Sequence, residues 1–312
     1  MEILIEVILK AGRSAVELSL FILLPVMVVM LSLMRLLEAK GVLDWLVSKL
    51  APVLKPFGLT GLGIFAALQI NFVSFAAPVA TLTMMDQRGA SDRHIAATLA
   101  MVMAMAQANV VFPMVAMGLQ FGSVLCFSLL GGLVAASATY YGFGRRLSTQ
   151  EKLLDETLHH PVAESAKGVL DVINRAGAEA FKIAVGAIPM LVLSLTVIMG
   201  LRAGGAIDAL TRMLSPLMAS LQLDTALILP TITKLLAGGT AMMGVMDEML
   251  RKGQVSALLL NQSAGFMIHP LDIPGIAVLI SAGSRVAGVW RPAVLGACIG
   301  VLVRSLGHAY FG

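Results

Sequence analysis

Residues 230–249 read PTITKLLAGGTAMMGVMDEM. They overlap most of an apolar run, 224–246, which small and polar residues interrupt near its middle. A second run, 59–85, is interrupted in the same way at 71–74. An α-helix rises about 1.5 Å per residue, so each arm of such a run reaches only about halfway across a membrane. Both runs therefore fit either a re-entrant helical hairpin or one interrupted crossing.

The composition of the chain indicates an integral membrane protein. Of its 312 residues, 58% are hydrophobic and only 13% are charged, and the mean hydropathy is +0.90. Soluble domains carry about 25% charged residues, so this chain lacks the polar surface of a soluble enzyme and the charge of a disordered chain. The net charge of +4 is typical of basic cytoplasmic loops, so we expect membrane lipid, and not nucleic acid, as a partner.

The second half of the chain repeats the order of the first. Adding 164 to the residue number places Pro25 on Pro189, Pro52 on Pro216 and Arg88-Gly89 on Lys252-Gly253, and after a gap of three residues Pro113 falls on Pro274. Internal duplication is typical of secondary transporters. It divides the chain into a first repeat at 1–143, a polar helical connector at 144–180 and a second repeat at 181–312.

The number of membrane crossings depends on the two interrupted runs. If 59–85 and 224–246 cross, each half has four crossings and the halves are parallel; if they re-enter, each half has three and the halves are inverted. The positive-inside rule does not separate these alternatives. The inverted arrangement places thirteen basic residues on the connector side and seven, Arg304 among them, on the other, and the parallel arrangement gives a similar ratio. Both place the connector 144–180 in the cytoplasm.

Polar breaks inside apolar runs are the best candidates for a binding site, because non-helical backbone at membrane depth is tolerated only inside the protein or beside a cavity. In the two hairpin candidates these residues are Gln69, Asn71, Ser74, Thr231, Thr233, Lys234, Gly238, Gly239 and Thr240. The amides and hydroxyls suit a neutral polar solute or a desolvated ion, although interhelical hydrogen bonding explains them too. Lys234 either contacts an anion or couples transport to protons, or it snorkels from the end of a half-helix.

Two further apolar runs, 94–119 and 254–280, are broken by polar residues and prolines. The candidates here are Gln107, Asn109, Asn261, Gln262, His269 and Asp272. Proline frees carbonyl groups upstream of it, so an unwound segment with His269 and Asp272 could bind a cation or relay a proton. The alternative is a helix end at the interface, where both side chains are hydrated. One His and one Asp are too few ligands for a zinc or iron site.

The remaining polar motifs predict no chemistry. Charged residues gather in two equivalent loops, which we interpret as solvated turns: Asp86, Arg88, Asp92 and Arg93, and Asp247, Glu248, Arg251 and Lys252. The abundant methionines fill gaps between helices more often than they bind soft metals. The sequence contains no nucleophile elbow, phosphate loop, HExxH or paired cysteines. We therefore expect a protein that is not an enzyme and that holds no metal or cofactor.

Each half resembles the Gate (nucleoside-recognition) domain of bacterial membrane proteins. The resemblance rests on NFVSFAAPVATLTMM at 71–85, RGASD at 88–92 and QANVVFP at 107–113, and on 230–249 and NQSAGFMIHPLDIPG at 261–275. This family includes spore maturation proteins, the membrane core of ferrous-iron transporters and a segment of concentrative nucleoside transporters.

The resemblance covers about 12–145 and 173–307. It implies an all-α polytopic membrane protein with two inverted repeats, each with about three transmembrane helices, a re-entrant hairpin and an interfacial helix. The hairpins lack glutamates like those that hold ribose in nucleoside transporters, so the resemblance does not imply a nucleoside substrate.

These observations predict a secondary transporter of the bacterial inner membrane that moves a small polar solute or ion by alternating access. Lys234, His269 and Asp272 are the predicted residues for charge or proton coupling, and the uncharged residues named above would contact the solute. A homodimer is compatible with this prediction. The alternative is a membrane assembly or accessory protein that transports nothing and docks a partner through 144–180.

Overall fold

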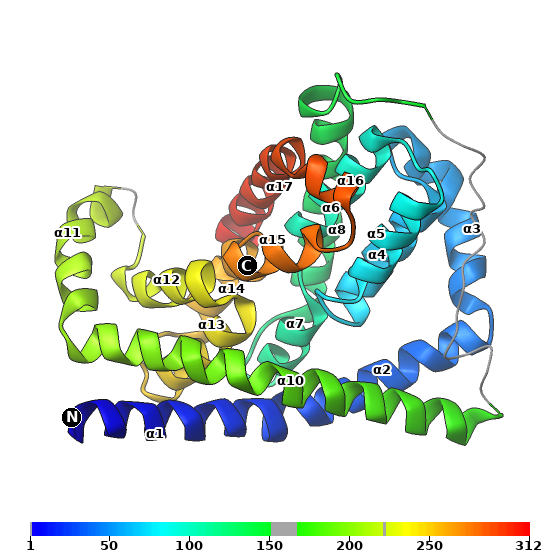
Figure 1. Cartoon of the computed structure of the whole chain (residues 1–312). Coiled ribbons are helices and arrows are strands. Elements are labelled where there is room, and N and C mark those ends of the chain that lie inside the picture. The colour runs from blue at the N-terminus through cyan, green and yellow to red at the C-terminus, as the bar shows by residue number, and fades with distance from the viewer. Residues whose placement is uncertain (1, 151–166, 221–222) are drawn as a thin grey trace.

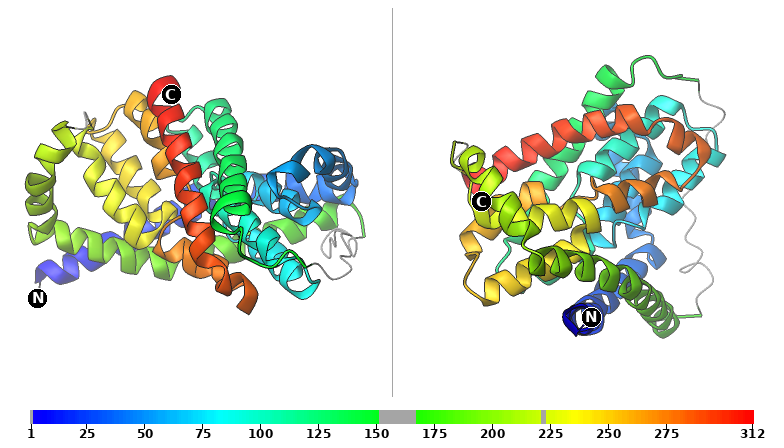
Figure 2. Two further views of the ribbon diagram at one scale, coloured as in Figure 1. Left: turned by 90° about the horizontal axis from the view of Figure 1, so that it is seen from above. Right: turned by 60° about the vertical axis from the view of Figure 1, so that its left-hand side comes forward.

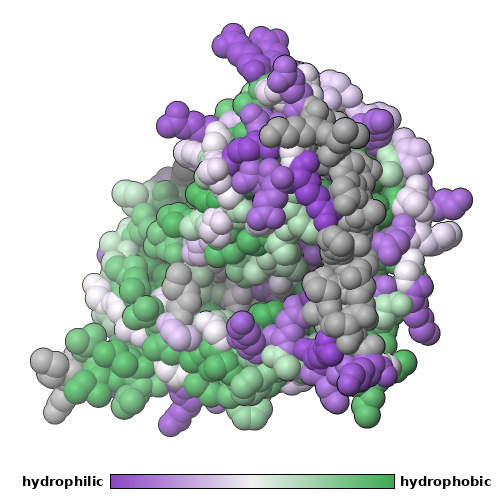
Figure 3. Space-filling model, turned by 45° about the vertical axis from the view of Figure 1, so that its right-hand side comes forward, coloured by the Kyte–Doolittle hydropathy of each residue, from purple (hydrophilic) through white to green (hydrophobic). Residues whose placement is uncertain are grey.

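The computed structural model describes residues 2–150, 167–220 and 223–312 (Figure 1). Every regular element in these ranges is a helix, which confirms the predicted all-α fold. Five helical segments are long and apolar enough to cross a membrane: Leu4–Ala39, Asp92–Val115, Phe121–Phe143, Val169–Ala203 and Trp290–Phe311. On the face shown in Figure 3, hydrophobic residues dominate the lower left and hydrophilic residues gather at the top and the lower right.

The first of these segments consists of three consecutive helical elements. α1 (Glu2–Val16), the π-helical η1 (Glu17–Leu23) and α2 (Leu24–Ala39) run on without a break. Pro25 lies in the first turn of α2, directly after the π-helical turn. Proline lacks the N–H for the ordinary helical hydrogen bond and its ring collides with the preceding turn, and a π-bulge is one way a helix accommodates such a residue.

The long helix α10 (Val169–Ala203) packs antiparallel to the α1–α2 segment, and the two lie side by side in Figures 1 and 2. At one end the Arg35 guanidinium contacts Glu179 (2.9 Å) and Glu38 (2.7 Å). Farther along, the buried Ser19 hydroxyl donates to the carbonyl of Ala184. Because α10 begins at Val169, the last part of the predicted connector belongs to this membrane-length helix.

Each of these long segments ends at a glycine in the left-handed region, followed by a shorter helix. Gly41 (φ 68°) precedes α3 (Val42–Leu54) and the short η2 (Lys55–Phe57), and Gly205 (φ 74°) precedes α11 (Ala206–Ser220). The two glycines are 164 residues apart, the offset found in the sequence. Glycine is the residue that adopts this backbone without a Cβ clash, so the repeat extends to backbone geometry.

Two helical hairpins follow at equivalent positions. The first consists of α4 (Gly61–Phe72) and α5 (Pro78–Gln87), and the second of η4 (Thr225–Leu227), α12 (Ile228–Ala237) and α13 (Gly239–Arg251). The two arms of each hairpin pack on one another. Gly89 (φ 77°) and Gly253 (φ 66°) turn the chain after each hairpin, again 164 residues apart.

Two broken helices come next. α6 (Asp92–Ala104) and α7 (Ala108–Val115) form the first, and α14 (Ala257–Met267) and α15 (Ile273–Ile280) form the second. Ser91 and Ser256 accept hydrogen bonds from backbone N–H groups at the starts of α6 and α14. Pro113 lies deep in α7, whereas Pro274 lies in the first turn of α15. The two prolines occupy different positions in their helices, so the predicted correspondence between them is wrong. The gap of three residues between the two halves of the sequence does not lie before these prolines.

The last helix of each half packs antiparallel to its counterpart. α8 (Phe121–Ser137), continued by the π-helical η3 (Ala138–Phe143), lies beside α17 (Trp290–Phe311), which the short α16 (Ser284–Gly288) precedes (Figure 2). Gly131 lies against Gly300, and Gly296 lies against Ala135. Small residues let the two backbones approach closely, a common basis of helix association in membranes.

Candidate functional site

The tip of the second hairpin meets the breaks of both broken helices. At this tip Gly238 adopts a φ of 86° and separates α12 from α13. A Cβ on Gly238 would lie 3.8 Å from a carboxylate oxygen of Asp272, and a Cβ on Gly239 would overlap the side chain of Gln107. The structure therefore brings together predicted residues from three of the four polar breaks.

A buried ion pair lies at one side of this tip. Lys234, in the last turn of α12, donates to Asp272 Oδ2 and to the carbonyl of Leu271, both at 3.3 Å. Both side chains are at most 2% exposed. The second oxygen of Asp272 accepts the N–H of Gly275 (2.8 Å) and so caps α15. The predicted snorkelling lysine is thus not observed: the ammonium group is directed to a carboxylate and not to the surface.

His269 is buried beside this pair. Its Nδ1 accepts the backbone N–H of Leu271 at 3.1 Å, so the neutral ring carries its proton on Nε2. That Nε2 is buried and has no hydrogen-bond partner among the described residues. The predicted alternative of a hydrated helix end does not apply, because His269 and Asp272 are 3% and 4% exposed. In the described ranges, no three His, Cys, Asp or Glu side chains form a metal-binding cluster.

Asn109, at the start of α7, connects the tips of both hairpins. Its Oδ1 accepts the backbone N–H of Phe75, between α4 and α5, and its Nδ2 donates to the hydroxyl of Thr240, in α13; both distances are 3.2 Å. The side chain of Asn109 is buried. One amide of the first half therefore contacts a hairpin from each half.

The polar residues of the first hairpin hold its own surroundings in place. Asn71 Oδ1 accepts from Ser128 at 2.7 Å, and Ser128 in turn accepts the N–H of Ala106, in the break of the first broken helix, at 2.8 Å. Gln69 accepts from Thr81 at 2.7 Å, which joins the two arms. Ser74 lies buried in the tip. These contacts make the first hairpin a support for the break at Gln107.

Other predicted residues lie elsewhere or already have partners. Asn261 uses its whole amide on backbone: it accepts from Gln120 (2.7 Å) and donates to Gly118 (3.0 Å) and Ala257 (2.8 Å). The buried Thr233 donates only to Leu229 of its own helix. Thr231 and Gln262 are half-buried. Asn261 thus tethers the loop between α7 and α8 and lies away from the tip contacts.

Arg304 is a buried charge that the sequence reasoning missed. The count of basic residues places it among the loop charges, yet it lies inside α17, fully buried. Its Nη1 donates to the carbonyl of Ala104 at the end of α6 (2.5 Å), whereas Nε and Nη2 have no partner among the described residues. Its position within the predicted apolar run 286–307 was the signal, because a charge there is costly.

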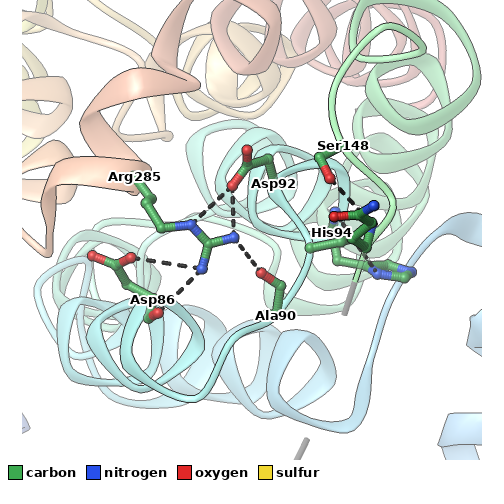
Figure 4. A network of polar contacts seen from close by, with 8 residues as sticks. Asp86, Ala90, Asp92, His94, Ser148 and Arg285 are labelled. Carbon is green, nitrogen blue, oxygen red and sulfur yellow. Dashed lines mark hydrogen bonds and ion pairs between the residues drawn. The ribbon is translucent and has the colours of Figure 1, made fainter. Parts of the chain in front are cut away.

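A second unforeseen cluster joins the two halves at the loop predicted to be a solvated turn (Figure 4). Arg285, in α16, donates to Asp92 at 2.6 Å, and its Nη1 lies 3.8 Å from Asp86. It also donates to the carbonyls of Asp86 (3.1 Å) and Ala90 (2.5 Å). These residues therefore form a structural contact between halves, in addition to any role in topology.

A cavity of about 670 Å³ lies between the α1–η1 segment, α10 and the second hairpin. Its charged lining comprises Lys10, Glu17, Arg202, Asp247, Glu248, Arg251 and Lys252, and includes none of the predicted binding residues. It opens beside the end of α13 remote from the tip. In this arrangement the tip contacts themselves are closely packed.

This arrangement of two hairpins and two broken helices is the fold of a concentrative nucleoside transporter. The transporter CNTnw in an inward-facing substrate-bound state is similar with a TM-score of 0.68 and 18% identity, over 95% of this chain and 76% of that one. A variant in an outward-facing state is similar with a TM-score of 0.68 and 16% identity, over 99% and 83%. A variant in an intermediate state reaches 0.70 and 18%, over 94% and 75%. At these identities the similarity establishes the fold.

The family comparison agrees with the sequence. Residues 20–144 match the model of the Gate family, described as nucleoside recognition, so the predicted resemblance is confirmed in this segment. The sequence matches no curated protein. The five membrane-length apolar helices indicate a multi-pass membrane protein, and the similar structures give it a transporter fold.

Proposed function

We propose that this protein is a secondary transporter that moves a small polar solute across the bacterial inner membrane by alternating access. The contact between the tip of the second hairpin and the break of the first broken helix carries this proposal. There Gln107 lies against Gly239, and Asn109 donates to Thr240. Helices that only pack together do not require polar breaks from two halves at one point. A site that binds a polar solute does require them.

The packing of corresponding helices supports inverted repeats. The α1–α2 segment is antiparallel to α10, and α8 is antiparallel to α17. The hairpin arms α4 and α5 have 12 and 10 residues, or about 18 and 15 Å at 1.5 Å per residue. Such arms favour a re-entrant hairpin over a crossing. With the broken helix α14–α15 as a sixth crossing beside the five membrane-length segments, each half has three crossings. The connector is then cytoplasmic, as the positive-inside rule predicts.

Burial of the tip supports alternating access. Gln107, Asn109, Lys234 and Asp272 are at most 4% exposed, so a solute reaches them only if a hairpin separates from a broken helix. The solved relatives adopt inward-facing, intermediate and outward-facing states. A similar movement here would expose the tip to each side of the membrane in turn.

Uptake into proteoliposomes tests this function. We would reconstitute the purified protein and measure counterflow with radiolabelled nucleosides, nucleobases, carboxylates and amino acids. The expected result is accumulation of one class of solute, abolished by Asn109→Leu and retained by Arg212→Gln, which changes an exposed residue of α11.

A connector variant separates this proposal from an accessory protein. Replacing 151–166 by a Gly-Ser linker should leave counterflow intact. An accessory protein that docks a partner through 144–180 predicts the opposite: no counterflow with any solute, and a cellular phenotype that the linker variant abolishes while Asp272→Asn does not.

A further inference from the structure

Buried hydrogen-bond donors without a partner gather around the breaks of the two broken helices. Of the ten buried side-chain atoms without a partner among the described residues, four belong to this region: Gln107 Nε2, His269 Nε2, and Nε and Nη2 of Arg304. Gln107, His269 and Arg304 are 2%, 3% and 0% exposed. An unsatisfied buried donor is destabilising, so several donors in one region require an explanation.

Two helix N-termini point into the same region. α7 begins at Ala108, directly after Gln107, and α13 begins at Gly239, against which Gln107 packs. Neither start has a side-chain cap, whereas α15 is capped by Asp272. The first turns of α7 and α13 therefore present free N–H groups and the positive ends of their dipoles, which favour a negative charge.

The charges of the region do not balance. Lys234 and Asp272 neutralise one another. Arg304 forms no ion pair with a carboxylate of the described residues, and its Nε and Nη2 have no hydrogen-bond partner there. The bond to Ala104 caps the end of α6 and uses one nitrogen of three. One positive charge and several donors thus remain without a counterpart.

We propose that the solute carries an anionic oxygen group, a carboxylate or a phosphate, held at Gln107 between the N-termini of α7 and α13, with Arg304 as the balancing charge. This inference rests on the proposed function and names the chemical class of its solute. Oxygen acceptors of an oxyanion match the free amide, backbone and guanidinium donors. A neutral nucleoside leaves the charge of Arg304 unbalanced.

Matched pairs of probes test the charge directly. We would measure thermal unfolding of the intact protein in detergent with uracil and orotate, with uridine and uridine 5′-monophosphate, and with benzamide and benzoate, each up to 10 mM. The members of each pair share a ring and differ in an anionic group. Orotate and benzoate report on carboxylates, and the monophosphate reports on phosphates.

The expected result is that at least one anionic probe raises the melting temperature and its neutral partner does not. Gln107→Leu keeps the size of the side chain and removes the donors. It should weaken the binding of that probe at least tenfold. Arg304→Gln should abolish the preference for the anion, and Arg304→Lys should retain it. Arg212→Gln, an exposed arginine of α11, should bind like the natural protein.

The outcomes separate this inference from the proposed transport. If the neutral probes bind as well as the anions, or if no anion binds, the inference is wrong, whereas transport of a neutral solute still stands. If Arg304 only supports α6, Arg304→Gln lowers the melting temperature but keeps the preference for the anion. That result would contradict the role of Arg304 as the balancing charge. Anion binding without counterflow supports the inference and contradicts transport. Circular dichroism and gel filtration establish that each variant is folded.

Discussion

The ammonium group of Lys234 and the carboxylate of Asp272, 38 residues apart in the sequence, lie 3.3 Å apart where α12 meets the start of α15. Neither group reaches the surface. The pair joins the second hairpin to the second broken helix by a charge contact. A buried pair of this kind makes the two side chains depend on one another for stability.

Removing one partner should therefore cost more than removing both. We expect Lys234→Met or Asp272→Asn alone to lower stability by about 3–5 kcal/mol, because each leaves a buried charge without its partner. The double variant should be more stable than either single one. Thermal unfolding of the four proteins in one detergent measures the coupling, and additive losses would show that the groups do not interact.

The hydrogen bond between Asn109 and Thr240 should matter more than the hydroxyl of Thr233. Thr240→Val and Asn109→Ala each remove this contact, and we expect a coupling of about 0.5–1.5 kcal/mol in a double-mutant cycle. Thr233→Val removes a bond to Leu229 of the same helix and is the matched control. We expect the first two variants, and not the third, to raise the KM of counterflow.

Position 285 should require arginine, and the stabilisation that Arg285 provides should depend on salt. Its guanidinium contacts two carboxylates and two carbonyls, which the ammonium group of a lysine cannot match. We expect Arg285→Lys and Arg285→Met both to lower the melting temperature. Because the side chain is 37% exposed, the difference from the natural protein should shrink as salt rises.

Arg251 provides the control for this prediction. It pairs with Asp247 of its own helix and is 72% exposed, so Arg251→Met should change stability by less than about 1 kcal/mol. Equal losses for Arg251→Met and Arg285→Met would contradict the assigned role of Arg285.

The small residues between α8 and α17 should tolerate no larger side chain. A Cβ at Gly131 would overlap the side chain of Arg304 and lie 2.7 Å from the carbonyl of Gly300. We expect Gly131→Leu to lower stability by about 1–3 kcal/mol or more, as overpacking does. Gly122, with nothing within 4 Å of its Cβ position, gives the control Gly122→Leu, and equal melting temperatures would contradict this packing.

The sequence predicted the fold class, and the residues of the candidate site stay a prediction. Breaks in hydrophobic runs marked the segments that form the hairpins and the broken helices, because polar residues are too costly in lipid to occur there by chance. The breaks alone did not decide between a hairpin and an interrupted crossing. The same criterion selects Lys234, His269 and Asp272, of which Lys234 and Asp272 form an ion pair. Their pairing was not predictable, because it depends on how the second hairpin folds back onto α15.

Arg304 and Asn261 show where such reasoning fails. Arg304 was assigned to a loop by counting charges, although its place in an apolar run met the criterion applied to Lys234. Asn261 was predicted to contact solute, but its amide satisfies three backbone groups at the loop between α7 and α8. A polar residue in an apolar run indicates that a partner exists; only the structure shows whether that partner is the protein itself.

Asn109 gives the molecule one further property. Because a single amide accepts from Phe75 and donates to Thr240, neither hairpin tip can withdraw without breaking a bond to the same side chain. The two bonds use opposite ends of one amide, so a single orientation of Asn109 serves both tips at once. Release of both tips together breaks both bonds, whereas release of one tip leaves Asn109 anchored to the other.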